Sequence, residues 1–121
     1  MTLPESGSLL RIFIGESDRH QGKPLYEWLV LRARQEGLAG ATVLRGLMGY
    51  GAHSRLHTFK VERLSEDLPI IVEIVDSTEK LNRFLEEVEE MLVGKPVLVT
   101  TERARVIHYR AGGRGKGEVG V

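Results

Sequence analysis

Apolar residues along the chain alternate with polar ones in several short stretches, and this alternation predicts β-strands. Leu9–Ile14 reads LLRIFI, so that Leu10, Ile12 and Ile14 fall on one side of an extended chain. Similar alternation or a high content of β-branched residues predicts four further strands: Gly40–Gly46, Leu68–Val75, Val97–Thr101 and Arg103–Tyr109. Leu68–Val75 carries the strongest of these patterns.

Two other stretches have apolar residues at spacings of three and four, which is typical of amphipathic helices. In the second stretch these residues are Leu81, Phe84, Leu85, Val88, Met91 and Leu92. Asp76 is predicted to cap this helix, with Glu79 completing a capping-box pattern. Gly94 and Pro96 are expected to end it. The first predicted helix, Leu25–Glu36, begins after Pro24 and ends at Gly37.

The predicted order is therefore strand–helix–strand, a long loop at about residues 47–66, and strand–helix–strand again. Two such halves predict an α+β fold of the ferredoxin-like βαββαβ type, with four antiparallel strands and both helices on one face. Residues 1–7 are expected to form a loose leader, residues 8–110 one domain, and residues 111–121 a glycine-rich flexible tail.

Composition narrows the class of protein without fixing its function. The chain has 121 residues, enough for one domain, and 17 Lys and Arg residues balance 17 Asp and Glu residues. The absence of an overall basic excess argues against a nucleic-acid partner. The absence of cysteine excludes disulfides and thiolate chemistry. With no signal peptide and no apolar run of spanning length, we expect a cytoplasmic protein.

Three stretches resemble the PII-like (GlnB-like) superfamily, and within it the uncharacterised group known as domain of unknown function one-ninety. GATVLRGLMGYGAHS, residues 40–54, resembles the strand that leads into the superfamily's T-loop. LPIIVEIVDS, residues 68–77, is similar to the strand that leaves that loop. VGKPVLVTTERARVI, residues 93–107, resembles the B-loop and the strands that follow it. With the matching element order, the resemblance covers about residues 9–109.

This resemblance implies a homotrimer whose sheets face inward, with a small-molecule site in each cleft between neighbouring subunits. In such proteins the ligand is commonly an adenine nucleotide, and no cofactor is required. The T-loop would then signal to an enzyme, a transporter or a membrane channel. The resemblance thus implies a sensor rather than an enzyme.

Two departures from the superfamily pattern refine this implication. The loop at residues 53–66 contains no tyrosine that could be uridylylated as in the nitrogen-regulatory PII proteins. The B-loop is shortened to Gly94–Lys95–Pro96 and lacks paired glycines around a phosphate. A triphosphate would be held less well there, so AMP is the favoured ligand.

Several residues are candidates for binding that ligand. The glycines of Gly49–Tyr50–Gly51 could bring backbone N–H groups to a phosphate, or could simply form a turn at the base of the loop. Lys95 could contact phosphate as a flexible point charge, or could only complement a helix C-terminus.

The remaining candidates are on predicted strands. Thr42 matches a position that contacts the adenine ring in the superfamily, and Arg45 follows it. Arg103, Arg105 and Arg110 are candidates for bidentate phosphate binding, which guanidinium groups favour. A solvated edge strand explains the same arginines equally well.

Two other classes of function remain open from the residues. His53 and His57, with nearby Glu62, could bind a divalent metal, as in the related divalent-cation tolerance proteins. No helix start signal precedes this segment, so solvated histidines are the simpler interpretation. A nucleotide hydrolase would need a general base, for which the sequence offers only His108 or Glu102.

Overall fold

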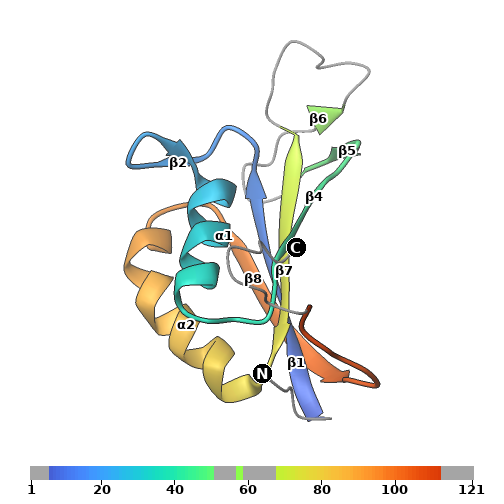
Figure 1. Ribbon diagram of the computed structural model, residues 1–121. Helices are drawn as coiled ribbons and strands as arrows, with labels where there is room; N and C mark the ends of the chain where they lie inside the picture. Colours follow the sequence, from blue (N-terminus) through green and yellow to red (C-terminus); the bar gives the residue numbers. More distant parts are fainter. Residues whose placement is uncertain (1–5, 51–56, 59–67, 113–121) are drawn as a thin grey trace.

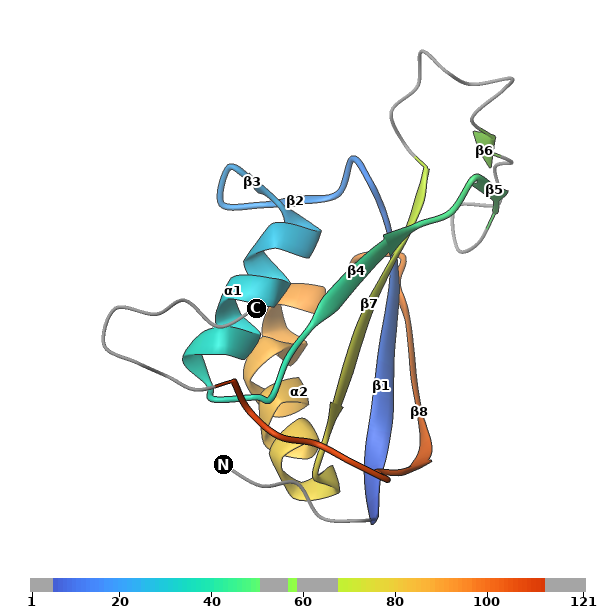
Figure 2. The same cartoon turned by 45° about the vertical axis from the view of Figure 1, so that its right-hand side comes forward.

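The computed structural model describes residues 6–50, 57–58 and 68–112, and its centre is a four-stranded antiparallel sheet (Figure 1). The strands are β1 (Ser6–Gly15), β4 (Thr42–Arg45), β7 (Pro69–Asp76) and β8 (Leu98–Arg105), in the order β4-β7-β1-β8. Two helices, α1 (Leu25–Gln35) and α2 (Thr78–Leu92), cover one face of the sheet (Figure 2). Two short ribbons pair β2 (Arg19–His20) with β3 (Lys23–Pro24) and β5 (Met48–Gly49) with β6 (His57–Thr58).

The predicted α+β, ferredoxin-like βαββαβ fold is confirmed by this arrangement. β1 pairs with both β7 and β8, and β7 pairs with β4, in each case antiparallel. Each helix therefore connects two strands that run parallel to one another with a third strand between them. The two halves of the chain interleave their strands, so neither half can complete the sheet without the other.

Strict alternation along the strands builds the core on the helical side. In β1 and β7 the even-numbered residues from Leu10 to Ile14 and from Ile70 to Ile74 are buried. The helices contribute Leu25, Leu29 and Ala33 from α1, and Leu81, Phe84, Val88 and Leu92 from α2. The period-two and period-3.6 patterns of the sequence thus converge on one apolar layer.

The opposite side of the sheet, which we call the open sheet face, has no helix over it (Figure 2). The strand register assigns to it the odd-numbered residues of β1 and β7 and the even-numbered residues of β4 and β8. Its large aliphatic and aromatic members are Leu9, Phe13, Leu44, Ile71, Val75 and Leu98. Leu44 and Leu98, which lie on the two edge strands, are 43% and 56% exposed.

The predicted cap of the second helix is wrong by one residue. Ser77 is the N-cap, and its side chain accepts a hydrogen bond from the Lys80 N–H at 3.2 Å. Asp76 instead occupies an inward-facing position of β7 and is only 1% exposed. Its carboxylate accepts hydrogen bonds from the backbone N–H of Ala39 at 2.8 Å and of Ser77 at 2.6 Å. Asp76 therefore joins the start of α2 to the α1–β4 connection.

The ends of the chain also differ from the prediction. One continuous strand, β8, replaces the two short final strands, and residues 106–112 follow it without regular structure. β1 begins at Ser6, inside the segment expected to be a leader. Residues 1–5 and 113–121, which hold most of the predicted leader and tail, lie outside the described residues.

The β2–β3 hairpin was not predicted, because its signal is short and atypical. Its two turn residues, Gln21 and Gly22, have φ values of 53° and 80°. Positive φ at both positions is the geometry that suits two-residue hairpin turns, which usually carry Asn-Gly or Asp-Gly. Pro24 closes the hairpin at the N-cap of α1 instead of forming the first helical turn.

Neither of the described helices has the length and apolar character needed to cross a bilayer.

The double hydrogen bond to Asp76 leads to a stability prediction. Asp76→Asn should lower the free energy of unfolding by about 1.5–3 kcal/mol, because one partly buried backbone N–H then faces the NH₂ group of an amide instead of a carboxylate oxygen. Urea unfolding followed by far-UV circular dichroism measures this difference. Glu86→Gln, at an exposed position of α2, is the matched loss of charge and should change stability by less than about 0.5 kcal/mol. Equal midpoints for the two variants would contradict the role given to Asp76.

Candidate functional site

The residues predicted to bind a ligand lie on opposite edges of the sheet. Thr42 and Arg45 are on β4, which is one edge strand, and Arg103 and Arg105 are on β8, which is the other. With two strands between them, β4 and β8 are about 14 Å apart across the sheet. The structure therefore does not bring the two groups of residues together within one chain.

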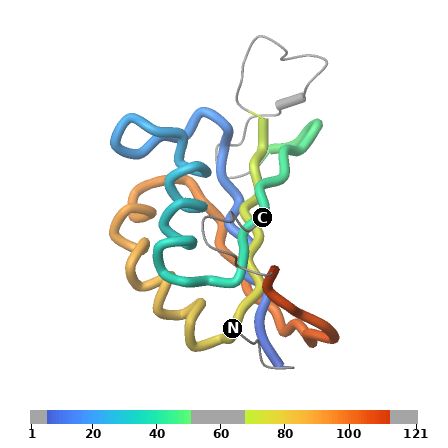
Figure 3. Tube along the Cα trace, in the orientation of Figure 1, coloured from blue at the N-terminus to red at the C-terminus, as the bar shows by residue number. Residues whose placement is uncertain are grey.

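The two groups are also separated along the strands (Figure 3). Arg45 is in register with Ile70 and, through Ile70, with Ile14 near the C-terminal end of β1. The loop that follows β4 leaves the sheet at this same end. Arg103 pairs with Ser8, near the opposite end of β1. Six residues of strand correspond to about 20 Å. The loop base and the late arginines therefore lie at opposite ends of the sheet, and Lys95, just before β8, lies at the loop end.

Arg45 already has a charged partner at the base of the loop. Its Nη2 donates to Oε2 of Glu16 at 2.6 Å, and the Glu16 side chain is only 18% exposed whereas that of Arg45 is 55% exposed. The Glu16 backbone N–H donates to the Leu68 carbonyl at 2.9 Å. Glu16 thus connects the end of β1 both to the strand that enters the loop and to the residue that leaves it.

Two glycines at the loop base pack closely against the side chain of Pro69. A Cβ on Gly46 would stand 2.9 Å from Cγ of Pro69, and one on Gly49 would stand 3.2 Å from it. The Gly46 N–H donates to the Pro69 carbonyl at 2.8 Å. This packing explains a glycine at position 49 without any contact to a phosphate. Tyr50 is 75% exposed, and Gly51 lies outside the described residues.

Lys95 lies in the short connection between α2 and β8. Gly94 before it has a φ of +85°, which ends the helical direction, and the Lys95 N–H donates to the Leu92 carbonyl at 3.1 Å. Its Nζ makes one long hydrogen bond, 3.4 Å, to the Arg19 carbonyl of the β2–β3 hairpin. A weak bond to a neutral carbonyl leaves this ammonium group able to turn toward an anion.

The late basic residues are all exposed, but they do not belong to one element. Arg103 and Arg105 are the last alternating pair of β8 and point to the same side of that strand. Arg110 and His108 lie beyond the strand, so strand alternation does not decide the direction of their side chains.

The structure also locates the residues on which the metal-binding and hydrolase alternatives depend. His57 belongs to β6 and pairs with Gly49, whereas His53 and Glu62 lie outside the described residues. Within the described part of the chain, no three acidic or histidine side chains gather as a metal site would require. Glu102, on β8, lies on the open sheet face and accepts a hydrogen bond from Arg11. His108 lies beyond the end of β8.

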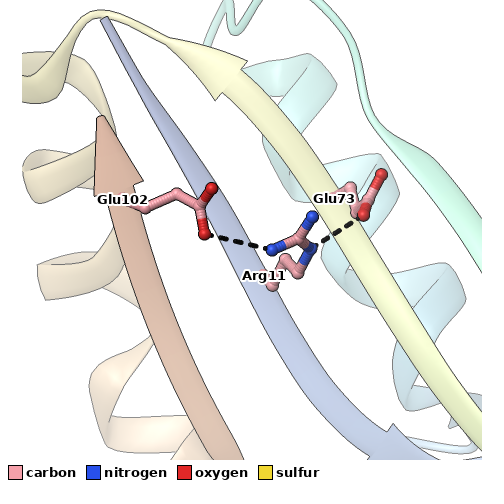
Figure 4. Close-up of polar contacts among 3 residues, drawn as sticks. All are labelled: Arg11, Glu73 and Glu102. Atoms are coloured by element: carbon pink, nitrogen blue, oxygen red, sulfur yellow. Dashed lines mark hydrogen bonds and ion pairs between the residues drawn. The ribbon is translucent and has the colours of Figure 1, made fainter. Parts of the chain in front are cut away.

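Sequence reasoning missed a cluster of charges at the centre of the open sheet face (Figure 4). Nε of Arg11 donates to Oε2 of Glu73 at 2.9 Å, and Nη1 of Arg11 donates to Oε1 of Glu102 at 3.3 Å. The hydrogen bond to Glu73 raises the pKa of the Arg11 guanidinium above its ordinary value. The available signal was that Arg11 and Glu73 each interrupt a strongly apolar strand at an odd-numbered position.

The four-stranded antiparallel sheet with two helices on one face is a ferredoxin-like fold. Among solved structures, the chain is similar to CPII, a nitrogen regulatory PII-like protein from Thiomonas intermedia K12 bound to ADP, AMP and bicarbonate. The TM-score is 0.64 at 18% identity, over 84% of this chain and 88% of that one. A putative PII-like signaling protein from Thermus thermophilus matches with a TM-score of 0.62 and 21% identity, over 84% and 90% of the two chains. At these identities the likeness establishes the fold.

The family follows from the sequence comparisons. The family model described as "DUF190: Uncharacterized ACR, COG1993" matches residues 7–106. A UPF0166 protein of Aquifex aeolicus is 44% identical over 100 residues, which are 83% of this chain and 92% of that protein. A UPF0166 protein of Methanocaldococcus jannaschii is 34% identical over 94 residues, 78% and 86% of the two chains. This chain belongs to the DUF190 family, and the predicted membership is confirmed.

The packing at the loop base can be tested with two glycines that flank β4. Gly46→Ala should lower the free energy of unfolding by about 1–3 kcal/mol, because its methyl group would overlap the ring of Pro69. Gly40→Ala is the control, since nothing lies within 4 Å of a Cβ there and its φ is not positive. Thermal and urea unfolding of both variants measure the difference. If both variants were as stable as the unmodified protein, the close contact with Pro69 would be disproved.

Proposed function

We propose that this protein is a cytoplasmic regulatory homotrimer that binds an adenine nucleotide, with AMP favoured, in clefts between its subunits. The observation that carries the proposal is the position of the candidate ligand residues on the two opposite edges of one sheet. A site that uses both edges requires two copies of the chain. A cleft between the β4 edge of one copy and the β8 edge of the next would meet that requirement.

The chemistry of the two edges supports an anionic, planar ligand. The β4 edge, together with the loop base that follows it, offers Thr42, Arg45, the backbone around Gly49 and the side chain of Tyr50. The other edge offers Lys95 and the arginines at 103, 105 and 110, which suit phosphate oxygens. The related CPII structure contains ADP and AMP, and we carry adenine nucleotide binding to this chain as part of the proposal.

The response to the ligand would pass through the segment at residues 47–66. That segment joins the sheet at Gly46 and Leu68, where Arg45, Glu16 and Pro69 meet. A phosphate beside Arg45 would compete with Glu16 for the guanidinium and so favour one arrangement of the loop base over another. The segment would then present this state to a channel, transporter or enzyme. We propose no catalytic step.

Isothermal titration calorimetry with AMP, ADP, ATP and cyclic dinucleotides tests the ligand, and native mass spectrometry of the same samples tests the assembly. We expect a trimer that binds AMP with the highest affinity of the four, because the short B-loop offers little to a longer phosphate chain. A trimer that gives no heat with any of them at millimolar concentration would refute nucleotide binding. A protein with the mass of one chain would refute the cleft.

The arginines at the β8 edge can be tested together. The variant Arg103→Gln/Arg105→Gln/Arg110→Gln should bind AMP at least about tenfold more weakly, because charge-assisted hydrogen bonds to phosphate each contribute about 1.5–3 kcal/mol. Calorimetry measures the loss, and native mass spectrometry checks that the trimer persists. Arg34→Gln, which removes an exposed arginine from α1, is the control and should leave the affinity unchanged. Equal affinities for both variants would remove these arginines from the site.

A further inference from the structure

The open sheet face combines an apolar surround with a charged centre. Leu44 on β4 and Leu98 on β8 are large exposed apolar residues at its two edges. Arg11 lies on β1 near the middle of the face, two residues along the strand from Phe13, which is in register with Leu44 and Leu98; it is flanked by Glu73 on β7 and Glu102 on β8 (Figure 4). A surface that was always in contact with water would have no need for apolar side chains on all four strands. The charged residues therefore lie among apolar side chains that would be stabilised by contact with another protein surface.

The three charged side chains are only partly satisfied by one another. Arg11, Glu73 and Glu102 have side-chain exposures of 34%, 28% and 63%. A guanidinium group carries five N–H donors, and the two bonds to the carboxylates use two of them. Glu102 is the most exposed of the three and is held by the longer bond. The cluster thus retains donors on Arg11 and acceptors on Glu102 that are available to a surface beyond this chain.

We propose that the Arg11–Glu73–Glu102 cluster sets the register in which copies of this chain pack their open sheet faces together. The inference rests on the proposed trimer and goes beyond it, because it assigns the specificity of the assembly to three residues. A second copy is the fitting partner, since one face carries both the available donors and the available acceptors and is therefore complementary to itself. Apolar side chains supply area without selecting a register, whereas opposed charges select one.

The cluster has different consequences in the single chain and in the assembly. In the single chain it is solvated, so its removal should leave the fold intact. Once copies cover it, losing Arg11 alone leaves two carboxylates per copy without a cation, which strongly opposes association. Removing all three charges together takes away that penalty, and also takes away the selection of register. Removing Arg11 alone should therefore weaken the assembly, whereas removing all three charges should change its stoichiometry.

Three variants and one control variant test this inference by native mass spectrometry and sedimentation velocity over a concentration series. Arg11→Met should raise the dissociation constant of the assembly about 100-fold or more, with unchanged circular dichroism. Arg11→Met/Glu73→Gln/Glu102→Gln should assemble again, but as a mixture of stoichiometries. Arg34→Met, on α1 and away from the sheet, should assemble as the unmodified protein does. Glu102→Gln is a milder variant on an exposed edge position, which should keep the affinity and broaden the stoichiometry even if Arg11→Met fails to fold.

The outcomes separate this inference from the proposed function. If the unmodified protein is a single chain at every concentration, the proposed trimer is refuted, and this inference falls with it. If the unmodified protein is a trimer and the Arg11→Met, triple and Glu102→Gln variants all form the same trimer at the same concentrations, the trimer stands and the cluster is an ordinary solvated ion pair. That second result would overturn the inference alone.

Discussion

Pairing of β1 with β7 on one side and β8 on the other is the interaction that organises the whole sheet. Both ladders extend along most of β1, so this strand fixes the register of its neighbours and the face to which each side chain points. A shift of one residue would move Leu10, Ile12 and Ile14 out of the core and Arg11 into it. The same pairing leaves β4 and β8 as edges, and the candidate binding residues lie on these edge strands or in the segments next to them.

The edge positions keep the two groups of candidate residues apart in a single copy. Across the sheet the loop base and the late arginines are separated by two strands, and along it by most of the length of β1. Each group presents its polar side chains at an edge where the backbone has a neighbouring strand on one side only. In the proposed trimer, such a site would couple ligand affinity to assembly, because the groups that hold the ligand would come from different copies.

Local packing at the loop base shows how the proposed ligand could act on the loop. Gly46 and Gly49 allow the chain to pass close to Pro69, and Glu16 holds Arg45 at the same place. The entrance and the exit of the loop are therefore joined through a few contacts, whereas the apolar core is held by many. Changes at this position can alter the loop base while the sheet and the two helices remain as they are.

Patterns along the sequence are enough to predict the elements, their order and the core, because alternation and helical spacing are local and arise wherever an element packs on one apolar layer. The ferredoxin-like fold could be predicted for this reason, whereas membership of the DUF190 family was predicted from the resemblance of three stretches to known members. Local patterns also located the loop and the basic residues after it. They could not show that Ser77 caps α2 in place of Asp76, since that choice depends on Ala39, which is distant in sequence.

Which residues meet is a property of the folded chain. Arg11, Glu73 and Glu102 form a cluster because β1 lies between β7 and β8. Thr42 and Arg103, assigned to one candidate site from the sequence, are separated because β4 and β8 are opposite edges. Pairing between strands is long-range, and a pattern read along one strand contains no information about its neighbours.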